Sequence, residues 1–353
     1  MANDTLAKDV RSVPVLDIGA LIACVNDAEV QSLADSPPFQ TMIAQLQAAA
    51  TEWGFFYIAN HGVKDEELEV FQTSMREFFK LPKDVKKTLQ RSATNSRGYF
   101  DAELTKNKLD WKEGFDYAGR QEDGALSVDS DIKRMGEDQN QWLDDETLPD
   151  FRTSMVEYFA RMEHIARRLI MLFALALGEK ATFLDQFFQT NGKAANSSFL
   201  RLNYYPVAPE PENVMGVHHH TDAGALTVLL QDDVVSSLQV FHRDSQQWYL
   251  IPPRKGTFVI NIGDMLQVWS NDRFLAPLHR VLANGSSERF SMPFFYNPSY
   301  NANVEPLITS TSGEAFKTPH YKPISWYDFR LRRFEGDYAD HGEEIQIAHF
   351  RVE

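Results

Sequence analysis

Histidines are the residues of this sequence that carry the most chemical information. A run of three, His218 to His220, is followed two residues later by Asp222. Successive side chains of a β-strand point to opposite faces, so His220 and Asp222 would share a face while His219 points away. An imidazole nitrogen beside a carboxylate oxygen suits a divalent metal ion of hard to intermediate character.

A third metal ligand should come from a distant strand, and His279, in the segment PLHRVL, is the natural candidate. Two histidines and one carboxylate that leave positions on the ion open form the facial triad of non-haem iron(II) oxygenases. The open positions allow dioxygen and an organic ligand to bind the metal together. On these residues alone, the alternative is a chance His-x-Asp and a histidine that only packs or forms hydrogen bonds.

An arginine and a serine, Arg289 and Ser291, follow His279 and would share one face of a strand. A guanidinium offers a planar fork to a carboxylate, and a neighbouring hydroxyl adds a donor. This is what the distal carboxylate of 2-oxoglutarate requires while its keto acid end chelates iron. Asn203 and Tyr205, in LNYYP, share a face by the same argument and could complete the site. The alternative is an ordinary surface arginine in a strand.

Helices are expected to dominate the first half of the chain. Apolar residues recur at helical spacing from Phe39, and a second helix should be capped by Asp65 and stopped by Pro82. A longer helix follows Pro149, and Gly178 is placed to end it.

The second half changes to short runs rich in Val, Leu, Phe and Tyr, separated by turn residues. The runs are SSFLRLNYYP, GALTVLLQD, SLQVFH, WYLIPP, GTFVINIGD, PLHRVL and RFSMPFFYNP. They predict a sandwich or barrel of jelly-roll type. Two earlier segments, VPVLDI and GFFYIAN, should be short buried strands, and ISWYDFRLRRF near the end should be a helix. No linker is visible, so we expect one catalytic unit over residues 1–353.

Composition excludes several classes of partner. The formal net charge of −15 over 353 residues disfavours nucleic acid and anionic membrane surfaces. No apolar run approaches the roughly 20 residues of a membrane helix, and no secretory signal is visible. A single cysteine, Cys24, rules out an internal disulfide and a cysteine-based zinc site. We therefore expect a cytoplasmic protein that acts on a small molecule.

Taken in order, these segments resemble the iron(II)/2-oxoglutarate dioxygenases of the isopenicillin N synthase type. The resemblance rests on NYYP, HTDAGALTVLLQD, SLQV, WYLIPP, VINIGDMLQVWSN, HRVL and RFSMPFF, and on VPVLDI and WGFFYIANHGV nearer the N-terminus. Two places depart from the usual pattern: SSLQV lacks the two glycines common before this leucine, and Pro277 is unexpected. Neither touches a proposed ligand.

The resemblance implies a mainly β fold with flanking helices, a double-stranded β-helix core buttressed by N-terminal helices. It implies an N-terminal dioxygenase region over 1–120 and an Fe(II)/2-oxoglutarate core over 195–300. The implied iron ligands are His220, Asp222 and His279. The implied 2-oxoglutarate contacts are Arg289, Ser291, Tyr205 and Asn203.

Substrate contacts are predicted from aromatic residues. Phe295 alternates with Arg289 and Ser291 on one strand, so it should face the same cavity. Tyr99, Trp111 and Phe115 are large enough to grip an apolar substrate at the pocket mouth. For each residue the alternative is a purely structural role in packing.

The resemblance implies that Fe(II), 2-oxoglutarate and O2 oxidise, most commonly hydroxylate, a small and largely apolar substrate, with release of succinate and CO2. Two alternatives stay open at this point. One is an oxidase of the same fold that does not use 2-oxoglutarate. The other is a non-catalytic barrel that binds a metal or a carboxylate.

Overall fold

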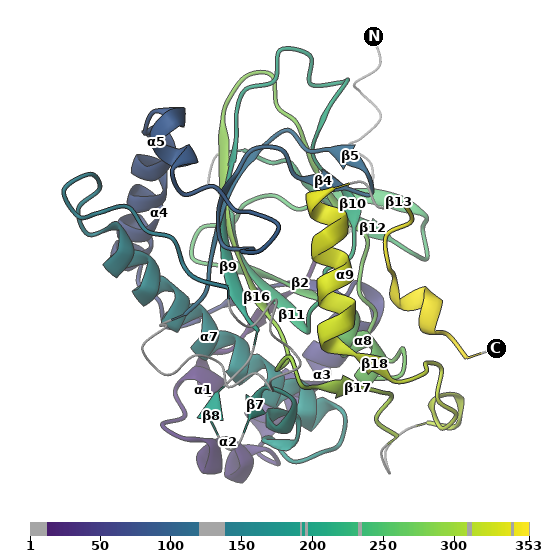
Figure 1. Ribbon diagram of the computed structural model, residues 1–353. Helices are drawn as coiled ribbons and strands as arrows, with labels where there is room; N and C mark the ends of the chain where they lie inside the picture. Colours follow the sequence, from purple (N-terminus) through teal and green to yellow (C-terminus); the bar gives the residue numbers. More distant parts are fainter. Residues whose placement is uncertain are drawn as a thin grey trace.

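Two β-sheets face each other at the centre of the molecule (Figure 1). The structure is a computed structural model that describes residues 13–119, 138–190, 193–194, 197–231, 235–308, 313–339 and 342–352. Helix α7 (Phe151–Ala176) packs against β11 (Leu226–Gln231) and β16 (Arg289–Tyr296) of the larger sheet. Helix α9 (Trp326–Tyr338) lies on the other side of that sheet, beside the smaller one (Figure 1).

The larger sheet has eight strands in the order β1-β2-β14-β11-β16-β9-β6-β3. All neighbours are antiparallel except β1 and β2, which are parallel. The strands are β1 (Val15–Asp17), β2 (Phe55–Ala59), β14 (Phe258–Ile262), β11 (Leu226–Gln231), β16 (Arg289–Tyr296), β9 (Phe199–Tyr205), β6 (Glu113–Tyr117) and β3 (Gly98–Phe100).

The smaller sheet has the antiparallel order β10-β15-β12-β13. Its strands are β10 (Met215–His220), β15 (His279–Leu282), β12 (Leu238–His242) and β13 (Gln247–Leu250). With β9, β16, β11 and β14 of the larger sheet they form the double-stranded β-helix. The predicted mainly β fold with a jelly-roll core is therefore confirmed.

The three long helices predicted in the first half are present. They are α3 (Pro37–Glu52), α4 (Asp65–Lys80) and α7 (Phe151–Ala176). Apolar side chains at helical spacing, such as Met42 and Leu46 of α3, are buried in the core. The predicted C-terminal helix is α9 (Trp326–Tyr338). The shorter helices are α1 (Gly19–Ile22), α2 (Asp27–Leu33), α5 (Lys83–Lys87) and α8 (Asp264–Trp269), with 3-10 turns at Phe183–Phe187, Glu314–Phe316 and Ile347–Phe350.

Two predicted helix ends can be compared in detail. The N-cap of α4 is Lys64, and Asp65 is the first helical residue, so the predicted cap was one residue late. Asp65 still contributes a negative charge to the first turn, where the helix dipole favours it. Gly178 does end α7. Its φ of +84° lets its N–H bond Leu175 O at 2.9 Å while the next N–H reaches Ala174 O at 3.0 Å, a Schellman motif.

The N-terminal part of the chain is built into the same sheet as the jelly roll. Strand β2 pairs with β14 at one end of the core strands, and β6 pairs with β9 at the other. Among the described residues there are also two-stranded ribbons: β4 (Leu104–Thr105) with β5 (Lys108–Leu109), β7 (Gln189–Thr190) with β8 (Lys193–Ala194), and β17 (Asn303–Val304) with β18 (Ile324–Ser325). Within the described ranges, none of the helices is both long and apolar enough to cross a membrane.

Candidate metal centre and co-substrate pocket

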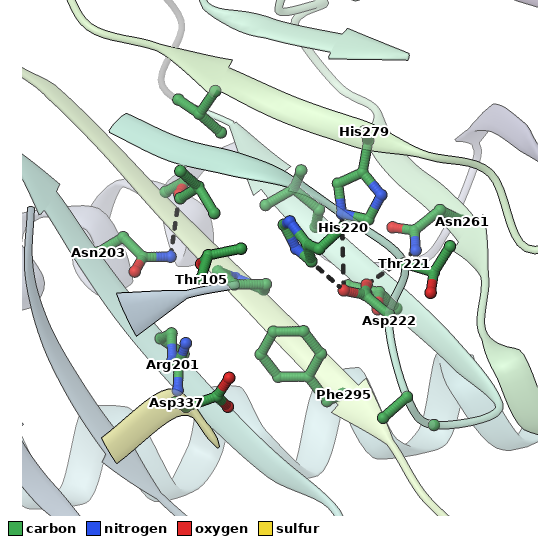
Figure 2. A pocket seen from close by; sticks show the side chains of 18 of the residues that line it. Thr105, Arg201, Asn203, His220, Thr221, Asp222, Asn261, His279, Phe295 and Asp337 are labelled. Carbon is green, nitrogen blue, oxygen red and sulfur yellow. Dashed lines mark hydrogen bonds and ion pairs between the residues drawn. The ribbon is translucent and has the colours of Figure 1, made fainter. Parts of the chain in front are cut away.

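The strand pairing of the smaller sheet brings the two candidate histidine ligands together. His220 ends β10 and is the register partner of His279, the first residue of β15. Asp222 follows in the loop after β10, and its Oδ1 lies 3.5 Å from Nε2 of each histidine (Figure 2). One potential ligand atom from each of the three residues therefore faces the same point.

Backbone carbonyls orient both imidazole rings. Nδ1 of His220 lies 2.8 Å from His218 O, and Nδ1 of His279 lies 3.1 Å from Pro277 O. A carbonyl can only accept, so each Nδ1 carries a hydrogen, and in the neutral ring the lone pair that binds a metal lies on Nε2. The expectation that Pro277 touches no proposed ligand was therefore wrong, because its carbonyl orients His279.

Two neighbours fix the carboxylate of Asp222. Asn261 Nδ2 donates to its Oδ2 at 2.8 Å, and the hydroxyl of Thr227 donates to the same oxygen. These bonds occupy Oδ2 and leave Oδ1 directed between the two histidines (Figure 2). Partners of this kind, behind the ligands, set the orientation and basicity of a metal site.

The electrostatics of Asp222 and His220 favour a bound cation. Burial alone would lower the pKa of His279, but the charge of Asp222 raises it. Burial alone would raise the pKa of Asp222, but the adjacent His279 and His220 hold it well below its usual range. Burial, and next the neighbouring His279 ring, lower the pKa of His220. The site therefore presents an ionised carboxylate and, at His220, a neutral imidazole, which are the protonation states that a metal requires.

A buried arginine lies deeper in the same cavity. Arg289 donates from Nη2 to Gln231 Oε1 at 3.3 Å, and its guanidinium lies 4.8 Å from the centre of the Tyr205 ring. Among the described residues its Nε and Nη1, and also Asn203 Oδ1, are buried without a hydrogen-bond partner. Asn203 Nδ2 points to Ser291 Oγ at 3.4 Å (Figure 2).

These residues fit the predicted ligands. A buried guanidinium with two unsatisfied nitrogens costs free energy that a bound carboxylate would recover. Two imidazole nitrogens and one carboxylate oxygen on one side of a cavity match the donor set of a facial triad. All seven residues predicted for iron and 2-oxoglutarate line one cavity.

Comparison with known proteins identifies the family. The profile of the 2OG-Fe(II) oxygenase superfamily matches residues 196–298, and that of the non-haem dioxygenase in morphine synthesis N-terminal region matches residues 13–145. Jasmonate-induced oxygenase 2 of Arabidopsis thaliana is 31% identical over 323 residues, 91% of this chain and 78% of the relative. The chain belongs to the 2OG-Fe(II) oxygenase superfamily. It is thus a 2-oxoglutarate-dependent dioxygenase that uses Fe(II), 2-oxoglutarate and O2.

Further relatives and solved structures are similar to this chain in sequence or fold. Homoarginine-6-hydroxylase 2-ODD-C23 of Glycine max is 35% identical over 315 residues, 86% of this chain and 91% of the relative. The crystal structure of JOX2 with 2OG, Fe and JA has a TM-score of 0.70 at 28% identity and covers 90% of this chain and 84% of that one. The dioxygenase for auxin oxidation in rice shares the fold, with a TM-score of 0.68 at 22% identity over 97% of this chain and 100% of that one.

The predicted substrate residues of the oxygenase divide into two groups. Phe295 lines the cavity, half-buried, and stacks on Phe199 with ring centres 4.7 Å apart. Tyr99 and Phe115 do not line it. They pair across β3 and β6, and Phe115 is the register partner of Leu202, on the sheet face opposite Arg201 and Asn203. Both rings are buried in the hydrophobic core, so the structure contradicts their assignment to the pocket mouth.

Trp111 is also absent from the cavity lining. Its indole N–H donates to Pro206 O at 3.0 Å, which holds the loop before β6 against the strand end. The aromatic side chains that line the cavity are instead Phe55, Phe199, Tyr205, Phe295 and Trp326.

The cavity of the oxygenase also holds a group of buried charges that were not predicted from the sequence. Arg201 of β9 binds both oxygens of Asp116, and Glu103 accepts ion pairs from Arg91, Lys112 and Arg201. Helix α9 adds further charged side chains, Arg330, Arg333 and Asp337. Strand alternation could have found Arg201, because it shares a face with Asn203 and Tyr205. The residues of α9 carried no such signal.

Proposed function

We propose that this oxygenase binds Fe(II) through His220, Asp222 and His279 and couples the oxidative decarboxylation of 2-oxoglutarate to hydroxylation of a small organic substrate. The observation that carries the proposal is the convergence of three oriented ligand atoms in one cavity with Arg289, whose Nε and Nη1 lack partners among the described residues.

The bound iron and co-substrate supply the oxidising chemistry, and the chain supplies orientation and exclusion of water. Arg289, with Ser291, Asn203 and Tyr205, binds the distal carboxylate of 2-oxoglutarate and so fixes which end of the co-substrate reaches the ligand triad. Asn261 and Thr227 keep Asp222 Oδ1 directed at the metal position. The buried walls of the cavity keep bulk water from the reacting centre.

The substrate chamber has an apolar wall. Phe295 and Phe199, which stack on each other, and Trp326 present rings to the cavity. Rings of this size bind an apolar or aromatic body well. The relatives are named for small molecules, including a flavonoid and homoarginine. We assign a small molecule with a largely apolar body to this chain as well.

Acidic composition and a single cysteine support a cytoplasmic enzyme without nucleic-acid or membrane partners. Fractionation of the source cells with an antibody to the protein tests the location. Recovery in a membrane or secreted fraction would contradict it.

The direct test of the function is succinate release from 2-oxoglutarate by the purified, iron-loaded protein. Basal release is expected without substrate, and stimulation is expected from a member of a panel of small aromatic, terpenoid, heterocyclic and amino acid compounds. Iron-loaded protein that consumes dioxygen with such a compound but forms no succinate would favour the oxidase of the same fold.

A further inference from the structure

One face of α9 closes the cavity opposite the jelly roll and carries two charges that pair with no residue in the described part of the chain. Trp326, Arg330, Arg333 and Asp337 recur at helical spacing on this face and all line the cavity. Arg333 is paired with Glu344 at 2.9 Å. No described residue forms a hydrogen bond or ion pair with the side-chain charge of Arg330 or Asp337. Both groups are therefore available to a ligand.

Arg330 lies at a cationic end of the cavity. Its guanidinium is 5.1 Å from the centre of the Phe199 ring, and Arg97 approaches the same ring at 5.1 Å. Burial lowers the pKa of Arg330, and repulsion from Arg97 and Arg201 adds to the effect, while Tyr300 and Asp337 oppose it. An arginine nevertheless stays protonated in proteins. A buried cation beside like charges is stabilised by an anion, and a carboxylate matches its fork.

Asp337 lies in the same cavity, within the influence of the carboxylate of Glu103. Burial, and next repulsion from Glu103, raise the pKa of Asp337 to about 7, and Glu344 adds to the effect, while Arg333 and Arg330 oppose it. Three cations, Arg91, Lys112 and Arg201, form ion pairs with Glu103, so Glu103 stays ionised next to Asp337. A ligand cation placed at Asp337 would relieve this repulsion.

Arg201, which lines the cavity near Arg330, is not free to bind substrate. Arg201 donates to the two oxygens of Asp116 at 2.7 and 2.8 Å and to Glu103 at 2.9 Å. It lies beside Asp337 and Phe295 in the cavity (Figure 2). The charge of Arg201 is already compensated by the carboxylates of Asp116 and Glu103. Of Arg201 and Arg330, Arg330 is therefore the residue that can bind an anion.

We propose that the substrate is a small zwitterion, with a carboxylate bound by Arg330, an ammonium-type cation bound by Asp337, and an apolar chain between them. The two residues are seven positions apart on α9, which separates their backbones by about 10 Å at 1.5 Å per residue. Phe199 and Phe295 supply the apolar surface for the chain. This inference rests on the proposed function, whose substrate class it names.

Three probes of one length separate the two charges: 6-aminohexanoate carries both, hexanoate only the anion, and hexylamine only the cation. Their binding is measured by calorimetry on iron-loaded protein with 2-oxoglutarate under argon. We expect 6-aminohexanoate to bind at least about tenfold more tightly than either relative, because each charge-assisted contact contributes on that scale. Equal binding of the three, or preference for a singly charged probe, overturns the proposal.

Two variants then assign each charge to its residue. Arg330→Gln should weaken hexanoate and 6-aminohexanoate about tenfold but leave hexylamine unchanged, and Asp337→Asn should weaken the two amines but leave hexanoate unchanged. Arg332→Gln and Asp328→Asn, exposed on the same helix, serve as matched controls and should alter none of the three. Equal weakening of all probes in both variants would indicate a structural role and overturn the assignment.

Succinate release distinguishes failure of this inference from failure of the proposed function. The protein could form basal succinate that singly charged or neutral compounds stimulate and no zwitterion stimulates. That outcome contradicts only the assignment of a zwitterionic substrate. Iron-loaded protein that forms no succinate under any condition contradicts the proposed function itself.

Discussion

The metal centre depends on single atoms rather than on residue types alone. Each histidine is useful because a carbonyl two residues before it, from His218 or Pro277, accepts from its Nδ1. Asp222 is useful because Asn261 and Thr227 hold one of its oxygens and leave the other free. Alternation predicted that His220 and Asp222 share a face, whereas Asn261, which orients Asp222, comes from a distant strand and could not be predicted.

The alternation of side chains along β10 leads to a prediction about two neighbouring histidines. His220→Ala removes a proposed ligand and should abolish turnover and Fe(II) binding. His219→Ala should keep both, because His219 is exposed while His220 lines the cavity. Metal titration by calorimetry and the melting temperature of each variant provide the measurement. An inactive His219→Ala beside an active His220→Ala would show that the register is wrong.

Arg289 permits a second prediction at the residue scale. Arg289→Ala should weaken 2-oxoglutarate binding by about one to two powers of ten, since a hydrogen bond to a charged group contributes about 1.5–3 kcal/mol. Arg289→Lys should recover only part of this, because an ammonium cannot match the guanidinium fork. Anaerobic titration of the iron–keto acid charge-transfer absorption measures both. An unchanged curve for Arg289→Ala would remove it from the site.

On strand β16, two adjacent phenylalanines point to opposite faces of the sheet. Phe295 faces the cavity, half-buried, whereas Phe294 is fully buried and packs edge-on against Phe159 of α7. We therefore expect Phe295→Ala to lose stimulation of succinate release by substrate with little change in melting temperature. Phe294→Ala, the matched control, should cost about 3–5 kcal/mol of stability. The assignment of Phe295 to the substrate is wrong if Phe295→Ala lowers the melting temperature as much as Phe294→Ala does and leaves the stimulation by substrate intact.

The elements also show why some predictions succeeded and others did not. On β16 the positions Arg289, Ser291 and Phe295 were predictable, because period-two alternation relates them to each other within one strand. For Phe115 the sequence could not supply the facing direction, which depends on its register with Leu202, far along the chain. The charged face of α9 follows the helical period, but nothing local shows which surface that face covers.

At the scale of the whole molecule, the N-terminal and jelly-roll regions share one sheet and one buried core. The sequence predicted one unit from the lack of a linker. It could not predict that β2 and β6 would flank the core strands, because those pairings are non-local.

A shared sheet predicts cooperative unfolding. Calorimetry should show a single transition for the full chain, and Fe(II) with 2-oxoglutarate should raise its midpoint as a whole, because ligands that bind only the folded state stabilise it by mass action. Two separate transitions, of which the ligands shift only one, would show that the N-terminal region is an independent domain.

The most direct test of the central claim is the ratio of succinate formed to dioxygen consumed by the iron-loaded protein with 2-oxoglutarate. We expect one succinate per dioxygen, a requirement for Fe(II), and loss of both activities in Asp222→Ala, whose carboxylate is a proposed iron ligand. Dioxygen consumption without succinate, or succinate formation that persists in Asp222→Ala, would contradict the claim.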